Sequence, residues 1–141
     1  MVPASPRILL RIATPRRHRD AGYARAVAGE IYGGSMRGRP DLVDRFLPAT
    51  NRPGHGRGYL YQLISGLGWT SLLMLPMIRQ PTLVLAGTDD PIIPLINARI
   101  MSRLLPDATL HVYDEGHLGI LIKADELAEI VSGFLTAQER P

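Results

Sequence analysis

The chain has 141 residues, of which 45% are hydrophobic and 21% are charged, a composition typical of a single globular domain and not of a disordered chain. It contains no cysteine, which excludes disulfides and thiolate metal sites, and no apolar stretch is long enough to span a membrane. Since the N-terminus also lacks the charged and then apolar pattern of a secretory signal, the sequence predicts a cytoplasmic protein.

The net charge of +3 conceals two unlike halves. Residues 1–60 hold 11 arginines and 4 acidic residues, whereas residues 61–141 hold 5 basic and 9 acidic residues. A basic half is compatible with nucleic-acid binding, but these arginines are scattered among prolines and glycines, without a reading helix or interleaved aromatic residues. We therefore expect an arginine-rich surface in contact with solvent and no nucleic-acid partner.

The first helical patterns precede residue 48. Residues 7–13 fit either a short strand or the start of a helix. Asp20 is placed to cap a helix that runs to about Tyr32 and ends at Gly33-Gly34. Another helix is expected to begin at Pro40 and to stop at Pro48.

The next segment is also helical in pattern. After a loop rich in proline and glycine over 49–57, an amphipathic stripe over 58–68 predicts a helix, formed by Leu60, Leu63, Ile64 and Leu67. The strongly apolar residues 69–77 predict a short, buried helical turn. Up to about residue 79 the sequence thus predicts small helices and loops.

From residue 80 the pattern changes to alternating strands and helices. The apolar run 82–86 predicts a strand buried on both faces of a parallel sheet, and a second strand is expected over 109–113. Between them lies a helix with Ile96, Ile100 and Leu104 on one face, and a last helix is expected over 124–136. This order predicts a right-handed parallel unit. Two parallel strands do not make an independent sheet, so the sequence reads as the second half of a larger domain.

Polar residues follow both predicted strands, with Asp89 and Asp90 after the first and His117 after the second. Chemistry in open α/β sheets takes place at these carboxyl ends, and neighbouring parallel strands lie only ~4.8 Å apart. An acid followed by a histidine is the chain order of the last two members of a Ser…Asp…His triad in α/β hydrolases. Taken alone, His117 fits a turn histidine without chemistry, but together with Asp90 it favours a catalytic pair. We interpret Asp89 as a turn or cap residue, and Asp114 and Glu115 as solvated turn acids.

Several segments resemble the intracellular poly(3-hydroxyalkanoate) depolymerases, a branch of the α/β-hydrolase fold. The matching runs are AGEIYGG at 28–34, GYLYQL at 58–63, GLGWTS at 66–71, RQPTLVLAG at 79–87, DDPIIPL at 89–95 and GHL at 116–118. The strand end at 87–90 marks any α/β hydrolase, whereas the GLGWTS and IYGG runs are specific to this branch. The resemblance implies a partial α/β-hydrolase fold, with residues 1–79 as a helical cap segment and residues 80–141 as the last two parallel strands and their helices.

The resemblance also implies a reaction. Asp90 would be the triad acid that orients the histidine, and His117 the base that shuttles the proton in hydrolysis of 3-hydroxyacyl esters, without a metal or a cofactor. The chain departs from the family at two points. It has no G-x-S-x-G motif, since Ser35 lies in GSMRG in the wrong register and no other serine has that context (Ser65, Ser71, Ser102 and Ser132). Gly119 stands where the relatives place a bulky apolar residue, which affects the packing behind His117.

The other histidines and the aromatic residues of the predicted helical part do not indicate a specific function. His18, His55 and His111 have no partners at metal-ligand spacing, so we expect no metal site and assign them surface or cross-strand positions. The aromatic residues of the predicted helical part fit either an acyl pocket or the core of the helical layer (Tyr59, Tyr61 and Trp69).

Three hypotheses are compatible with these patterns. In the first, the chain is the cap and acid–base half of an ester hydrolase, inactive alone because it lacks a nucleophile and an oxyanion hole. In the second, it is a non-enzymatic interaction module that docks on a complementary N-terminal half through the free edge of the strand at 82–86. In the third, it is a truncated or mis-started reading frame, since Met1 falls where the family enters its cap.

Overall fold

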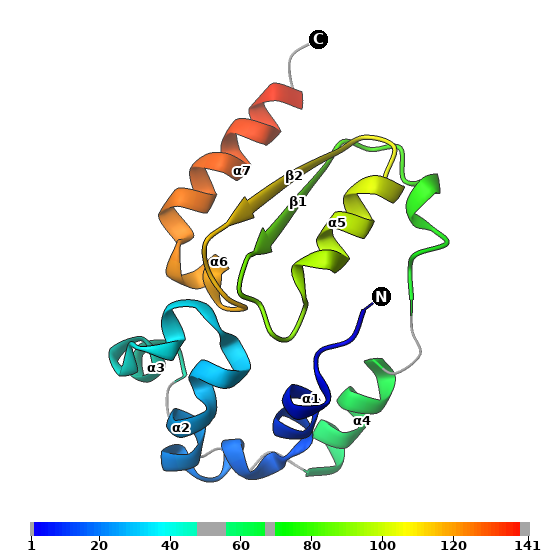
Figure 1. Ribbon diagram of the computed structural model, residues 1–141. Coiled ribbons are helices and arrows are strands. Elements are labelled where there is room, and N and C mark those ends of the chain that lie inside the picture. Colours follow the sequence, from blue (N-terminus) through cyan, green and yellow to red (C-terminus); the bar gives the residue numbers. More distant parts are fainter. Residues whose placement is uncertain (1, 48–55, 67–69, 139–141) are drawn as a thin grey trace.

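The computed structural model describes residues 2–47, 56–66 and 70–138, with helices in the first half and a small sheet in the second (Figure 1). The helices are α1 (Pro6–Ala13), α2 (Ala21–Tyr32), α3 (Pro40–Phe46), α4 (Gly56–Gly66), α5 (Leu95–Leu104), α6 (Gly119–Ile122) and α7 (Ala124–Gln138). Short 3-10 turns are η1 (Pro15–His18), η2 (Gly34–Arg37) and η3 (Leu75–Met77), and the strands are β1 (Thr82–Gly87) and β2 (Ala108–Tyr113).

Local capping sets the boundaries of the first helices, as the sequence predicted. The Asp20 side chain accepts a hydrogen bond from the Tyr23 backbone N–H at 2.9 Å, and Gly33 ends α2 with a φ of +66°. Pro40 occupies the first turn of α3. The ambiguous segment at 7–13 is helical, since α1 begins at Pro6 after the N-cap Ser5.

The strands β1 and β2 pair in parallel, from Thr82 opposite Ala108 to Gly87 opposite Tyr113, so both end at the same edge of the sheet. Both strand predictions are confirmed. The predicted burial of β1 on both faces is wrong: only Val84 and Gly87 are buried in it, because β2 is the only strand paired with β1 within the described residues.

Two hydrophobic clusters hold the described part together. One joins the helical half, meaning α1 to α3 with the turns between them, to α6. It consists of Ala28, Met36, Leu42 and Val43, with Leu118 and Ile122 packed against it. The other joins α5 and η3 to the sheet and consists of Leu75, Val84, Ala98 and Leu105. The tips of the two strands lie where the helical half meets the sheet (Figure 1).

The buried face of α5 differs from the predicted one. Ile96 is 39% exposed and Leu104 is 36% exposed, whereas Asn97 and Ala98 are buried. Another set at helical spacing, Ala98, Met101 and Leu105, packs toward the sheet instead. Helical spacing alone does not distinguish two such faces, and the small Ala98 side chain permits close packing.

Apolar side chains remain exposed on α4 and around η3. Leu60 and Ile64 are each 52% exposed, Leu73 is 86% exposed and Met77 is 69% exposed. Over residues 70–77, the described part of the segment predicted to be buried, only Leu75 is fully buried and the prediction is largely wrong. Trp69 lies outside the described residues, while Tyr61 is 66% exposed and so is not core within the described part of the chain. Among the described residues of α7, only Leu127 is fully buried.

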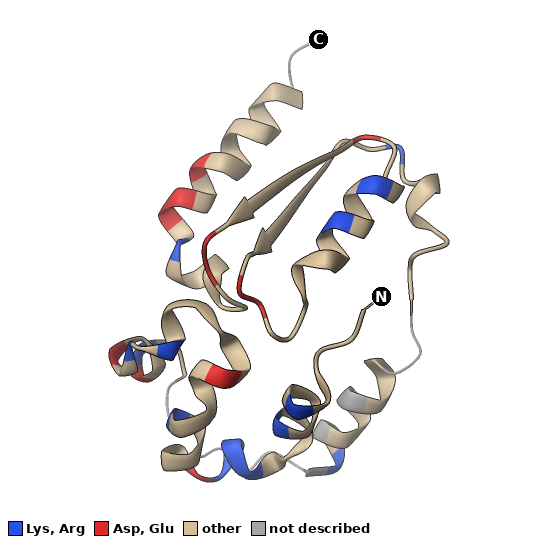
Figure 2. Cartoon of the chain, in the orientation of Figure 1, with Lys and Arg blue, Asp and Glu red and all other residues tan. Residues whose placement is uncertain are grey.

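Arginines are spread along the helices and turns of the first half (Figure 2), and most of those that the structure describes are exposed. The pairs within this half are Arg7 and Arg11 with Glu30, Arg16 with Asp20, Arg25 with Asp44, and Arg39 with Asp41. An arginine-rich surface was predicted, and five of its arginines pair with acidic side chains of the same half.

Candidate active site

Asp90 and His117 meet at the strand tips. The His117 Nδ1 atom lies 2.9 Å from Asp90 Oδ2, at hydrogen-bond distance. The other carboxylate oxygen of Asp90 accepts hydrogen bonds from the backbone N–H groups of Ile92 and Ile93, each at 2.8 Å. The Asp90 side chain is 12% exposed and that of His117 is 30% exposed, so the carboxylate is largely covered while part of the imidazole faces solvent.

Tyr32, at the end of α2, holds His117 from the helical half. The His117 backbone N–H donates to the Tyr32 carbonyl at 2.7 Å. The two rings stack with their centroids 6.4 Å apart and their planes 24° from parallel. Tyr32 was not singled out as a site residue from the sequence. Its only signal there was its place in the IYGG run.

This geometry suits acid–base chemistry. A histidine that donates from Nδ1 to a carboxylate keeps its Nε2 lone pair free to accept a proton from a nucleophile. The Ser35 hydroxyl donates to the Glu115 carboxylate, so in this arrangement its proton is not directed at the imidazole. The sequence reading of Ser35 as lying in the wrong register therefore agrees with where its hydroxyl points.

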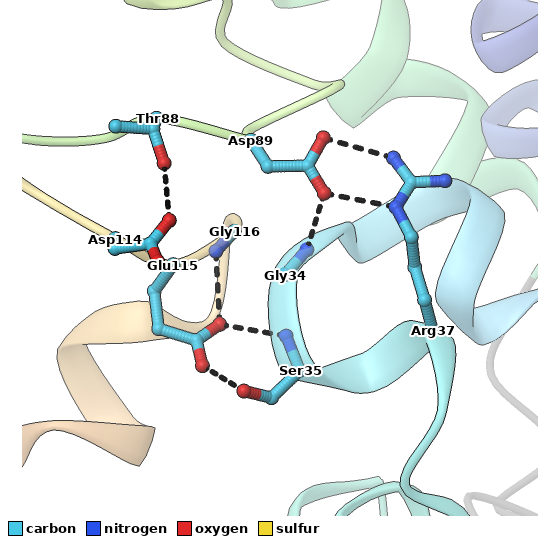
Figure 3. A network of polar contacts seen from close by, with 8 residues as sticks. All are labelled: Gly34, Ser35, Arg37, Thr88, Asp89, Asp114, Glu115 and Gly116. Carbon is cyan, nitrogen blue, oxygen red and sulfur yellow. Dashed lines mark hydrogen bonds and ion pairs between the residues drawn. The ribbon is translucent and has the colours of Figure 1, made fainter.

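Next to this pair, Asp89 connects the tip of β1 to η2 (Figure 3). Its carboxylate accepts hydrogen bonds from the Gly34 backbone N–H at 2.8 Å and from Arg37 Nε and Nη2 at 2.8 and 3.0 Å. The predicted role as a cap residue holds in part, since Asp89 binds the first N–H group of η2. The bidentate ion pair with Arg37 was not foreseen.

Glu115 makes the corresponding connection from the tip of β2. It is 3% exposed and accepts hydrogen bonds from the backbone N–H groups of Ser35 and Gly116, both at 3.0 Å, and from the Ser35 hydroxyl (Figure 3). The prediction of a solvated turn acid is wrong, because Ser35, 80 positions away in the chain, supplies two of the donors. The same prediction is right for Asp114, which is exposed and accepts from Thr88 Oγ1 at 2.9 Å.

Glycines make these close approaches feasible. Gly34 has a φ of +51°, and a Cβ there would overlap a Glu115 carboxylate oxygen. A Cβ on Gly119 would overlap the ring of Tyr113, which is itself buried. The tyrosine ring thus takes up the space beside Gly119, so packing behind the site is filled although the chain departs from its relatives at this position.

The carboxylates of Asp89 and Glu115, which bind the turn at 33–37, both have lowered pKa values. Hydrogen bonds from Arg37 lower the pKa of Asp89, against desolvation and with help from the Gly34 N–H. Burial would raise the pKa of Glu115, but the hydrogen bonds from Ser35 and Gly116 together outweigh it and lower the pKa. A carboxyl group whose pKa is lower in the folded than in the unfolded state stabilises the fold at pH values above its unfolded-state pKa. This contribution is lost as the pH falls through the folded-state pKa.

We therefore expect acid destabilisation that depends on Glu115. Below pH ~4.5, the ordinary range of a glutamate pKa, the free energy of unfolding of the wild-type chain should fall steeply with pH, and Glu115→Gln should fall less steeply. Urea denaturation at a series of pH values between about 7 and 3 measures the slope. Asp114→Asn controls for the loss of one acidic charge. If the free energy of unfolding fell equally steeply with pH in Glu115→Gln and in the wild type, the stabilising role of the Glu115 carboxylate would be contradicted.

No cluster of metal-ligating side chains is found in the described residues. They bring no three metal-ligating side chains together, and His111 stacks on Tyr113 with ring centroids 6.5 Å apart. His55 lies outside the described residues. A hollow of about 800 Å³ beside α2 and η2 is lined by four arginines (Arg7, Arg25, Arg37 and Arg39), but each of them pairs with an acidic side chain.

Residues 24–124 match the family model described as alpha/beta hydrolase fold, and the chain belongs to that family. A curated poly(3-hydroxyalkanoate) depolymerase from Ectopseudomonas oleovorans is 46% identical over 140 residues, which cover 99% of this chain and 49% of that protein. A 2-hydroxy-6-oxononadienedioate/2-hydroxy-6-oxononatrienedioate hydrolase from a Pseudomonas species is 32% identical over 93 residues, covering 64% of this chain and 33% of that protein.

Solved structures show the same fold. The enol-lactonase from Burkholderia xenovorans LB400 superposes with a TM-score of 0.72 at 20% identity, covering 93% of this chain and 51% of that one. A thermophilic esterase from Thermogutta terrifontis gives a TM-score of 0.69 at 20% identity, covering 96% of this chain and 52% of that one. The predicted resemblance to the depolymerases is confirmed, and the chain spans about half the length of these relatives or less. None of the described helices has the length and hydrophobicity needed to cross a membrane.

Proposed function

We propose that this chain supplies the acid and the base of a serine ester hydrolase similar to the poly(3-hydroxyalkanoate) depolymerases. The observation that carries the proposal is the 2.9 Å contact between His117 Nδ1 and Asp90 Oδ2 at the tips of two parallel strands. The 141 residues contain no G-x-S-x-G motif, so the nucleophile and the oxyanion hole come from a complementary half. The proposed substrates are esters of 3-hydroxyacyl groups.

In this scheme His117 moves the proton. A serine oxygen attacks the ester carbonyl carbon while His117 Nε2 takes the hydroxyl proton, and Asp90 stabilises the resulting imidazolium. His117 then returns the proton to the departing alcohol, which leaves an acyl-enzyme. Water repeats the sequence, releasing the hydroxy acid and restoring the serine. The scheme requires no metal and no cofactor.

Unpaired strand edges and exposed apolar side chains support a complementary half. Within the described residues β1 and β2 pair only with each other, which leaves one edge of each strand without a partner strand. Large apolar side chains are exposed on α4 and around η3, among them Leu60, Ile64, Leu73, Met74 and Met77. Under this proposal residues 1–79 form the cap segment and residues 80–141 the part of the core that completes the sheet.

An esterase assay tests the proposal. We expect the purified chain to hydrolyse a p-nitrophenyl acyl ester no faster than buffer, and turnover to appear when it is mixed with the part of the Ectopseudomonas oleovorans depolymerase that it does not span. Robust turnover by the chain alone, abolished by His117→Ala, would contradict the requirement for an external nucleophile. Complex formation without turnover would contradict the acid–base role.

The second candidate function is a non-enzymatic interaction module. The engagement of the Ser35 hydroxyl by Glu115, together with the missing nucleophile motif, favours it. Size-exclusion chromatography separates the two candidates. A monodisperse chain that binds its complementary half without any gain of activity is the result expected for a module, whereas rescue of activity on mixing is expected for the hydrolase.

A further inference from the structure

We propose that Glu115 and Asp89 are positioning residues, which clamp the turn at 33–37 to the two strand tips and thereby keep His117 aligned with Asp90. The inference rests on the proposed function, because alignment matters only if the pair transfers protons. It assigns a task to a buried carboxylate and an ion pair that the acid–base scheme leaves unused.

Each strand tip contributes one residue that binds the turn at 33–37 and one residue of the Asp90–His117 pair. At the tip of β1, Asp89 binds the turn while the next residue, Asp90, binds His117. At the tip of β2, Glu115 binds the turn while His117, two residues on, binds Asp90. The tips are also tied directly, since the Asp89 backbone N–H donates to the Glu115 carbonyl at 3.1 Å. Each member of the pair is therefore one or two residues from a clamped point.

The turn contacts the tips through successive backbone groups. The Gly34 N–H donates to Asp89 and the Ser35 N–H donates to Glu115, while the Tyr32 carbonyl accepts from the His117 N–H (Figure 3 shows the first two contacts). The positive φ values of Gly33 and Gly34 set the direction of the turn. Two attachments from the turn and one from Tyr32, the residue before it, fix the turn relative to His117, so a shift of the turn shifts the imidazole.

The cost of burying Glu115 argues for a role in orientation. A buried carboxylate loses hydration, and apolar residues of similar volume often stabilise a junction as well or better. Hydrogen bonds, unlike apolar contacts, require defined directions and distances. This carboxylate lies where the helical half meets the strand tips and receives three donors, so it specifies how the helical half is placed over the pair.

The test is an NMR measurement on the 141-residue chain with ¹⁵N-labelled histidine. In the wild-type chain the His117 Nδ1–H proton should be shifted downfield and protected from solvent exchange by Asp90. In Ser35→Ala and Glu115→Gln its exchange should be at least about tenfold faster under conditions where circular dichroism shows a folded chain, as expected for loss of one hydrogen bond to a charged group. Ser35→Thr, which keeps the hydroxyl, and Asp114→Asn should behave as wild type.

The outcomes separate the two claims. Unchanged His117 exchange in folded Ser35→Ala and Glu115→Gln would overturn the positioning role and leave the proposed function standing. A wild-type chain without the downfield signal would contradict the Asp90–His117 pair itself. If Glu115→Gln fails to fold, Ser35→Ala against Ser35→Thr decides. If neither Glu115→Gln nor Ser35→Ala folds, the exchange of His117 in Arg37→Gln decides, because Arg37 is 52% exposed and binds Asp89. Arg39→Gln, which breaks only the local pair with Asp41, is the control for that variant.

Discussion

Replacing His117 with alanine should abolish ester hydrolysis by the complemented enzyme, with a loss of kcat/KM of roughly 10³-fold or more, since general base catalysis alone contributes about 10² to 10⁴. Asp90→Asn should cost a similar factor. The asparagine amide would still fill the site and accept from Ile92 and Ile93, but it could not stabilise the imidazolium and would favour the wrong tautomer.

The measurement is hydrolysis of a p-nitrophenyl acyl ester by the chain mixed with its complementary half. Asp114→Asn is the matched control, because Asp114 is an exposed acid at the same strand tip that binds Thr88 and not His117. Circular dichroism and size exclusion must show that each variant folds and assembles. If His117→Ala or Asp90→Asn retained more than about a tenth of the activity, the acid–base assignment would be wrong.

Gly33→Ala should destabilise the chain strongly, lowering the free energy of unfolding by more than about 3 kcal/mol. Gly33 has φ +66° and ψ −162°, a region that is essentially restricted to glycine. Its new Cβ would overlap the Asp89 carbonyl oxygen and lie 2.9 Å from Pro91 Cδ, so relief requires moving the loop that carries Asp90.

Gly38→Ala is the matched control for this change. Gly38 follows η2, has a φ of −129°, and a Cβ there would meet no atom within 4 Å. It should change the free energy of unfolding by less than about 1 kcal/mol. Urea denaturation of the three proteins measures the difference. A Gly33→Ala variant as stable as Gly38→Ala would show that the turn at 33–37 does not contact the strand tips closely.

Features that depend on neighbours in the chain were predictable from the sequence. The cap at Asp20, the end of α2 at Gly33 and the two strands each depend on a few adjacent residues. The approach of His117 to Asp90 was also predictable, because one crossover between parallel strands brings the two tips side by side.

The connections between distant segments were not predictable in the same way. Glu115 reads as a solvated acid because nothing within a few residues shows that Ser35, 80 positions earlier, will cover it and donate to it. The choice of the Ala98 face of α5 over the Ile96 face likewise depends on packing against the sheet. The Gly33-Gly34 pair was read only as a helix end, although a left-handed turn that aims two N–H groups outward is also a signal for a carboxylate partner.

The most direct test of the acid–base assignment is the distance between two atoms. A crystal structure of the 141-residue chain should place His117 Nδ1 within about 3.2 Å of Asp90 Oδ2, with the imidazole edge facing the carboxylate. A separation beyond about 4 Å, or an imidazole turned away from Asp90, would contradict the claim that this chain carries a preformed proton-transfer pair.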